Sequence, residues 1–126
     1  AAAAAAPVDA VAGDFFRDAL TEADLFAMSR IVHDWPEQKI HHLLARVFDR
    51  LPDGGGILLA EKLLQEDKTG PTSTHMQSLN MLICTEGKER TLSEYRQLLE
   101  KASFREVRGK VTSSPLDAVL AIKTSG

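Results

Sequence analysis

A histidine and several carboxylates follow the buried strands that the sequence predicts, close to the point where each strand ends. Asp14 comes after the first apolar run, and Glu61 lies late in the third. His33 and Asp34 follow the second run. Function in open α/β sheets gathers beyond the carboxyl ends of the strands, so we expect these groups to share one edge. A histidine with a carboxylate nearby is a general-base arrangement, because the carboxylate fixes the tautomer and stabilises the imidazolium.

Each of these groups also has a purely structural interpretation. Asp34 is a candidate helix N-cap, with Glu37 three residues later closing a capping box. His33 taken alone is more often a structural histidine than a catalyst, and Glu61 is also compatible with a solvated position at a strand end. The residues by themselves therefore predict an α/β domain in which a histidine base is one option.

The elements that must position these groups alternate along the chain. Apolar runs at 8–11 and 24–32 predict strands, and the second is typical of an inner strand covered on both faces. Apolar spacing from 40 to 51 predicts a helix that ends before a Pro-Asp-Gly-Gly-Gly turn. The order predicts a mostly parallel sheet whose last two strands are antiparallel neighbours. The later predicted elements are a strand at 57–64, a helix at 74–84, a helix after a Thr91–Glu94 capping box, and strands at 104–111 and 116–122.

Composition excludes several classes of protein. The 126 residues are 44% hydrophobic and 26% charged with a net charge of −3, which lacks the basic footprint of a nucleic-acid binder. A single cysteine excludes an intrachain disulfide and a cysteine-based zinc site, and indicates a cytoplasmic setting. No apolar run approaches the roughly 20 residues that cross a bilayer. We interpret residues 1–7, which include six alanines, as a tag, linker or unassigned stretch.

Five motifs in a fixed order resemble one family, the small-molecule class I O-methyltransferases that use S-adenosylmethionine. Within that family the resemblance is closest to the acetylserotonin O-methyltransferase-like branch. It covers nearly all of residues 8–123, and it implies that residues 8–126 are the C-terminal part of a Rossmann-like catalytic domain. The motifs are Gly13-Asp14-Phe15-Phe16, Arg30-Ile31-Val32-His33-Asp34-Trp35, Leu51-Pro52-Asp53-Gly54-Gly55-Gly56, Ala60-Glu61 and Gly87-Lys88-Glu89-Arg90-Thr91.

The resemblance implies a role for ten residues. His33 matches the general base, and Glu61 and Glu89 match the two acids that flank and orient it. S-adenosylmethionine is the implied cofactor, and the implied acceptor is a small hydroxyindole or phenol. No metal site is expected. The implied cofactor contacts are Gly13, Asp14, Phe15 and Arg30, and the implied substrate contacts are Asp34, Asn80 and Cys84.

Departures from the family pattern lead to further expectations. The glycine-rich cofactor loop and the N-terminal dimerisation domain should precede Val8, so we expect this segment alone to be inactive and the full-length protein to be a homodimer. Cys84 replaces an amide side chain of the acetylserotonin branch, and an unpaired ligand group there would cost about 1–3 kcal/mol.

The alternative function is a catalytically silent binding or dimerisation module fused to another enzyme domain. A nicotinamide-binding Rossmann enzyme is a third possibility, disfavoured by the Asp14-Phe15 corner and the antiparallel terminal pair.

Overall fold

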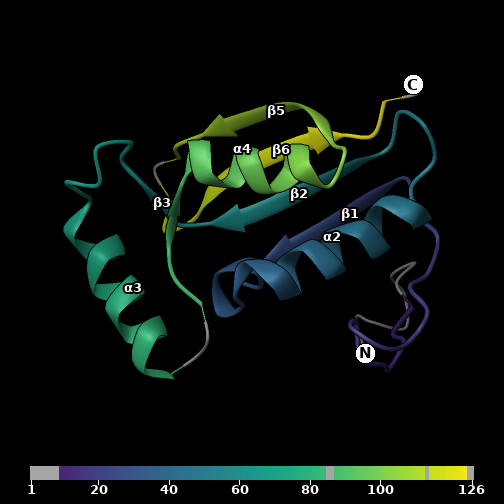
Figure 1. Ribbon diagram of the computed structural model, residues 1–126, viewed down its shortest axis with the longest axis horizontal. Helices are drawn as coiled ribbons and strands as arrows, with labels where there is room; N and C mark the ends of the chain where they lie inside the picture. The colour runs from purple at the N-terminus through teal and green to yellow at the C-terminus, as the bar shows by residue number, and fades with distance from the viewer. Residues whose placement is uncertain (1–8, 85–86, 113, 125–126) are drawn as a thin grey trace.

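The computed structural model describes residues 9–84, 87–112 and 114–124, and for residues 80–84 it describes the backbone alone. Its centre is a four-stranded sheet with the order β1-β2-β6-β5 (Figure 1). The first pair is parallel, and β6 runs antiparallel to both of its neighbours. Three strands therefore point one way and one points the other, as the sequence predicted. The strands are β1 (Leu25–Ser29), β2 (Gly56–Glu61), β5 (Arg105–Lys110) and β6 (Asp117–Ile122).

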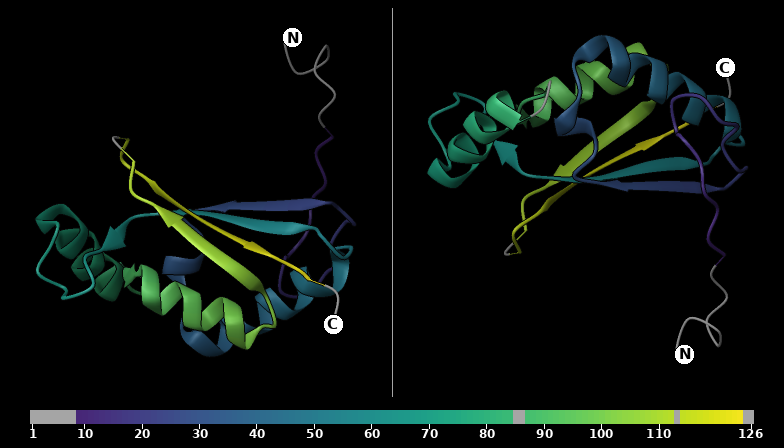
Figure 2. Two further views of the ribbon diagram at one scale, coloured as in Figure 1. Left: turned by 90° about the horizontal axis from the view of Figure 1, so that it is seen from above. Right: turned by 90° about the horizontal axis from the view of Figure 1, so that it is seen from below.

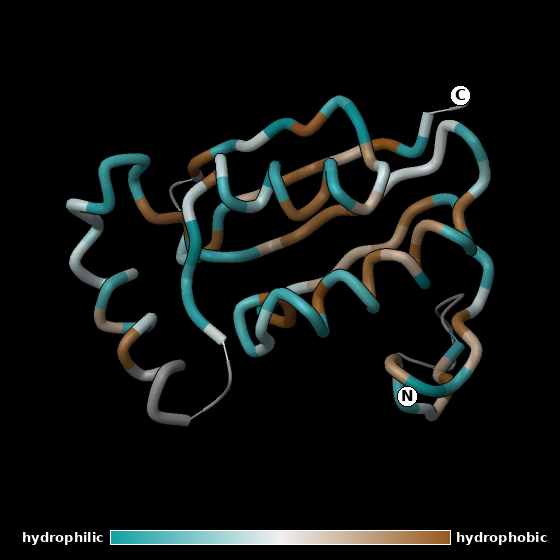
Figure 3. The backbone as a smooth tube through the Cα atoms, viewed as in Figure 1, coloured by the Kyte–Doolittle hydropathy of each residue, from teal (hydrophilic) through white to brown (hydrophobic). Residues whose placement is uncertain are grey.

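Two amphipathic helices cover one face of this sheet. Both α2 (Glu37–Arg50) and α4 (Leu92–Lys101) lie on the same side when the molecule is seen from above or below (Figure 2). The apolar stripe predicted for α2 is buried, and hydrophobic residues follow the inner strands (Figure 3). Phe104 and Phe48 meet edge-on in this core, with ring centroids 5.2 Å apart. The core thus fixes the strands whose ends carry the candidate site.

Shorter elements lie beyond the carboxyl ends of β1 and β2. A single 3₁₀ turn, η1 (Val32–Asp34), follows β1, and β3 (Leu63–Leu64) follows β2 after one residue. β3 pairs in parallel with β4 (Arg90–Thr91), and α3 (Thr72–Cys84) connects these two short strands at the end of the molecule (Figure 1). No helix among the described residues has the length and apolar character needed to span a membrane.

Three predictions about the first strands were wrong. Residues 9–11 form no strand, and Val8 lies outside the described residues. The predicted strand at 24–32 ends at Ser29, because Arg30 adopts a positive φ of 57° and the chain then turns into η1. β1 lies at the edge of the described sheet with Leu25 53% exposed, and within the described residues the helices cover one face only. It is therefore not the inner strand, covered on both faces, that its composition predicted.

Two further boundaries differ from prediction. Asp34 does not cap α2; Pro36 occupies the N-cap position, and no side-chain hydrogen bond is made there. The predicted strand at 57–64 is divided at Lys62, where the Leu63 N–H donates to the Asp117 carboxylate at 3.1 Å. By contrast, the predicted capping box is confirmed, since the Thr91 hydroxyl accepts from the Glu94 N–H and the Glu94 carboxylate accepts from the Thr91 N–H.

Candidate active site

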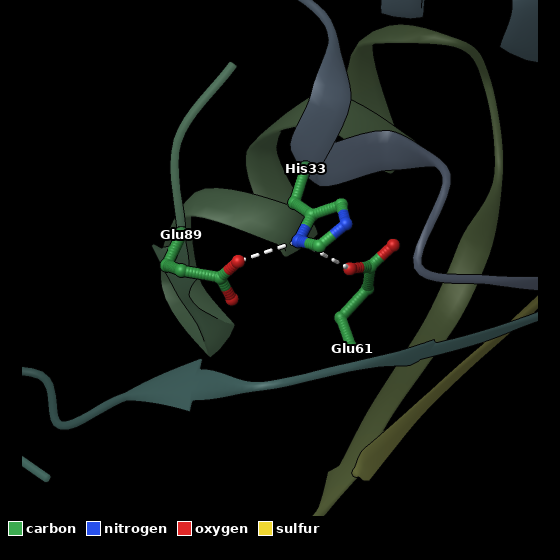
Figure 4. A group of neighbouring side chains, drawn as sticks. All are labelled: His33, Glu61 and Glu89. Atoms are coloured by element: carbon green, nitrogen blue, oxygen red, sulfur yellow. Dashed lines mark hydrogen bonds and ion pairs between the residues drawn. The ribbon is translucent and has the colours of Figure 1, made fainter. Parts of the chain in front are cut away.

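The imidazole of His33 lies between two buried carboxylates (Figure 4). Its Nδ1 is 2.5 Å from Oε1 of Glu89 and 3.7 Å from Oε2 of Glu61. All three side chains are buried, with 5%, 2% and 0% of His33, Glu89 and Glu61 exposed. On the opposite side of the ring, Nε2 lies 3.3 Å from Oδ1 of Asp34. The structure thus brings together four of the predicted site residues.

The fold explains how residues so far apart in sequence converge. β1 and β2 are parallel, so His33, after β1, and Glu61, at the end of β2, reach the same edge. Glu89 directly precedes β4 and therefore lies at the amino end of that strand. Because β4 pairs with β3, which begins just beyond Glu61, this end lies beside the site. The short β3–β4 ladder therefore completes the site that the larger sheet begins.

Glu61 also organises the backbone that carries the histidine. Its Oε1 accepts hydrogen bonds from the N–H groups of Ile31 and Val32, each at 3.0 Å. Burial raises the pKa of Glu61 to about 7, although the nearby His33 and these two hydrogen bonds lower it. The other oxygen of Glu61, Oε2, has no hydrogen-bond partner among the described atoms and faces the ring.

The carboxylates set the basicity and the tautomer of His33. Burial by itself lowers the pKa of this imidazole, but the hydrogen bond to Glu89 and the charges of Glu61, Glu89 and Asp34 outweigh burial, and the pKa is raised above 6.5. Because the contact of Nδ1 with Glu89 is much shorter than that of Nε2 with Asp34, the neutral ring is expected to carry its proton on Nδ1, and Nε2 is then the nitrogen that can accept a proton. This arrangement can accept a proton from a group placed near Nε2.

The same three side chains offer one nitrogen and two oxygen donors within 4.8 Å of one another, a possible ligand set for a divalent cation. Two ligands of one zinc ion, each at about 2 Å, lie roughly 3 Å or more apart. The 2.5 Å separation between His33 and Glu89 is instead that of a strong charge-assisted hydrogen bond. The geometry therefore favours an oriented base over a metal centre.

The predicted cofactor corner packs directly against the loop of the histidine. Phe16 meets Trp35 edge-on with ring centroids 5.0 Å apart, and Trp35 is two residues beyond His33. Within the corner, Oδ1 of Asp14 accepts from the Phe16 N–H at 2.8 Å, and the Asp14 side chain is exposed. Arg46 donates to the carbonyls of Phe15 and Asp18, which fastens the corner to α2. A pocket of about 170 Å³ is lined by residues of this corner, including Gly13, Asp14 and Phe15.

The remaining predicted site residues are less closely placed. Arg30 is exposed between β1 and η1, in the left-handed backbone conformation. Asn80 and Cys84 belong to the last turns of α3, and their side chains lie outside the described residues. A hollow of about 470 Å³ is lined by Glu22, Asp24 and other residues around the amino end of β1, away from the histidine.

Two residues to which the sequence assigned no separate role lie deep in the structure. Arg90 is 2% exposed, and Tyr95 is fully buried. Burial and the charge of Glu61 raise the pKa of the Tyr95 phenol well above 10. Their sequence signals were weak, because Tyr95 occupied an ordinary helical core position and Arg90 was one residue of a longer motif.

Comparison with known proteins identifies the family. The profile of the O-methyltransferase domain family matches residues 1–105. This chain belongs to that family. Acetylserotonin O-methyltransferase from Gallus gallus is 53% identical over 111 residues, covering 88% of this chain and 32% of the relative. The chain thus spans about a third of the length of such O-methyltransferases.

Two further comparisons agree with the family membership. The crystal structure of human N-acetylserotonin methyltransferase in complex with SAM aligns with a TM-score of 0.88 and 50% identity, covering 90% of this chain and 33% of that one. A probable bifunctional dTTP/UTP pyrophosphatase/methyltransferase protein from Homo sapiens is 51% identical over 114 residues, which are 90% of this chain and 18% of that protein.

Proposed function

We propose that the chain carries the base-containing part of an O-methyltransferase that methylates a small hydroxylated aromatic compound, of the hydroxyindole or phenol type. The observation that supports this most strongly is the buried contact between Nδ1 of His33 and Glu89, with Glu61 on the same side of the ring. A scaffold has no physical need to bury an imidazole against two carboxylates. Burying these ionisable groups costs free energy, and this cost is expected where catalysis requires a base with an adjusted pKa.

His33 acts as the general base. Its Nε2 takes the proton of the acceptor hydroxyl while the oxygen forms its new bond to carbon, and Nδ1–H remains bound to Glu89. Glu61 stabilises the resulting imidazolium and holds the backbone at Ile31 and Val32. Asp34, beside Nε2, and Asn80 and Cys84 of α3 are the proposed contacts to the acceptor.

S-adenosylmethionine is the proposed methyl donor; when bound, it would supply an electrophilic sulfonium methyl group to the acceptor oxygen and would leave as the neutral thioether. The residues present are compatible with its adenosine end. Asp14 is exposed, and with Gly13 and Phe15 it lines a pocket beside the base-bearing loop. Arg30 is the proposed fourth contact, exposed at the end of β1. The relative solved in complex with SAM is 50% identical to this chain, which supports this assignment.

We infer that this segment needs the rest of a methyltransferase domain for turnover, because it spans about a third of its relatives. The test therefore uses a chimera in which this chain replaces the matching 111 residues of the Gallus gallus relative. Labelled methyl transfer from S-adenosylmethionine to a panel of hydroxyindoles and phenols is measured. We expect turnover by the chimera and none by the 126-residue chain alone.

The His33→Ala variant of the chimera should lose about 10²- to 10⁴-fold in kcat, the usual contribution of general-base catalysis. His41→Ala, which removes a partly buried histidine on α2, is the matched control and should retain activity. Equal activity of the His33→Ala chimera and its parent would refute the assignment of the base.

A further inference from the structure

One buried arginine holds together the two segments that carry the histidine and its closest carboxylate. Arg90 is 2% exposed, and its guanidinium donates to three backbone carbonyls. Nη1 donates to the oxygens of Val32 at 3.3 Å and Lys88 at 3.2 Å, and Nη2 donates to the oxygen of Trp35 at 3.2 Å. Burying a guanidinium is costly unless its donors are paired, so such a residue needs a reason to be there.

The three carbonyls that Arg90 binds belong to residues directly next to proposed site residues. Val32 directly precedes His33, and Trp35 directly follows Asp34. Lys88 directly precedes Glu89. The guanidinium is planar and rigid, so it fixes the spacing between the backbone segments that it joins more precisely than a flexible ammonium can. The 2.5 Å contact between His33 and Glu89 spans the same two segments.

Gly87 makes a second, independent contact between these segments. A Cβ atom added at Gly87 would collide with the carbonyl oxygen of His33 and would lie 2.5 Å from the carbonyl carbon of Asp34. The backbone at 87 therefore packs directly on the backbone of the histidine loop, where no side chain fits. Gly87 and Arg90 contact the loop at different points of residues 32–35.

The histidine loop depends on such external support. η1 is a single turn of three residues, and its N-cap makes no side-chain hydrogen bond. Isolated turns of this length are not stable by themselves. Glu61 holds the loop from one side through the N–H groups of Ile31 and Val32, and Arg90 holds the carbonyls of Val32 and Trp35.

We propose that Arg90 is a positioning residue, which fixes the His33 loop against the Glu89 segment so that Nδ1 meets Glu89 and Nε2 remains available. This inference rests on the proposed role of His33 as the base. The inference adds that the Arg90 guanidinium sets the orientation of the His33 ring, because it binds the backbone of both the His33 loop and the Glu89 segment. Lysine cannot replace it. The hydrogen bonds of Arg90 go to backbone carbonyls and not to the His33 ring, so Arg90 is not a catalytic residue in this proposal.

The test compares Arg90→Lys with Arg96→Lys. Arg96 is an exposed arginine on α4 that also donates to a backbone carbonyl, that of Val107 at 3.4 Å, so it is a matched control. In the 126-residue chain, NMR of labelled histidine reports the tautomer and titration midpoint of the His33 ring. In the chimera, kcat and KM are measured with S-adenosylmethionine and a hydroxyindole.

Arg90→Lys should shift the midpoint and tautomer signals of His33 and lower kcat by about 10²-fold, the size expected for a displaced catalytic group, with little change in the KM for S-adenosylmethionine. Arg96→Lys should change neither. Wild-type His33 behaviour in a folded Arg90→Lys variant would overturn the proposal.

If Arg90→Lys does not fold, Arg90→Gln is used, because a neutral amide avoids burying a poorly paired charge. Loss of folding in both variants would make Arg90 a stability residue of the whole domain, and this result would also overturn the proposal. If the chimera has no activity at all, the proposed function fails, and the NMR result still decides the role of Arg90.

Discussion

Nδ1 of His33 lies 2.5 Å from Oε1 of Glu89, although the two residues are 56 positions apart in the sequence. The contact is buried and charge-assisted, and therefore shorter than an ordinary hydrogen bond between neutral groups. It fixes which ring nitrogen carries the proton.

Replacing Glu89 should make His33 a weaker base. Glu89→Gln removes the charge that raises the pKa of His33 and weakens the hydrogen bond that also raises it, whereas the burial that lowers this pKa remains. NMR titration of the His33 ring should therefore give a lower midpoint than in the wild type. Glu100→Gln, at an exposed site on α4, should leave the midpoint unchanged. An unaltered midpoint in Glu89→Gln would show that the contact does not form in solution.

Glu61 should make the protein less stable as pH rises. Its pKa is raised from 4.5 to about 7 in the folded state, so the folded state binds this proton more tightly than the unfolded state. The associated stability is fully present below pH 4.5 and is lost as the pH rises towards about 7. Such a shift corresponds to on the order of 3 kcal/mol of unfolding free energy across that window.

Urea unfolding of the wild type and Glu61→Gln at several pH values measures this effect. The comparison is cleanest between pH 4.5 and about 5.5, because an unfolded histidine with the ordinary pKa of 6.5 is still mostly protonated there, and the raised pKa of His33 keeps the ring protonated in the folded state as well. The variant should show a flatter dependence on pH than the wild type, and Glu100→Gln should follow the wild type. Parallel curves for the wild type and Glu61→Gln would contradict the raised pKa.

The contact between Phe16 and Trp35 should couple the cofactor corner to the histidine loop. Edge-on aromatic pairs contribute about 0.5–1.5 kcal/mol beyond their buried area. Urea unfolding of the 126-residue chain should therefore give a coupling free energy of about 0.5–1.5 kcal/mol for the double-mutant cycle of Phe16→Leu and Trp35→Leu. Strictly additive effects of the two substitutions would mean that the corner and the loop act independently.

The capping box of α4 should contribute measurably to stability. Thr91→Ala removes the hydroxyl that accepts from the Glu94 N–H, and loss of such a cap costs about 1 kcal/mol. Thr91→Ser keeps the oxygen and is the matched control. Denaturant unfolding should place Thr91→Ser close to the wild type and Thr91→Ala below it; equal losses in both variants would assign the effect to the buried methyl group instead.

Hydrophobic periodicity predicted the helices well and the strand ends poorly. The stripe from Ile40 to Val47 and the Thr91–Glu94 box define α2 and α4, because helical spacing and capping are local properties. The breaks at Arg30 and Lys62 were not predicted, because they arise from partners elsewhere in the chain. The Glu61 carboxylate accepts hydrogen bonds from the two N–H groups that follow Arg30, those of Ile31 and Val32. The Asp117 carboxylate accepts from the N–H of Leu63, the first residue of β3.

By itself the sequence determined the alternation of elements, the antiparallel final pair and the placement of His33 and Glu61 at the ends of parallel strands. Its family motifs pointed to Glu89 as well. The tertiary structure alone decided that Glu89 meets Nδ1 and that Arg90 joins the two segments. The reason is physical: the direction of the His33 ring and the contacts of Arg90 with the histidine loop depend on residues more than 50 positions apart, which no local pattern encodes.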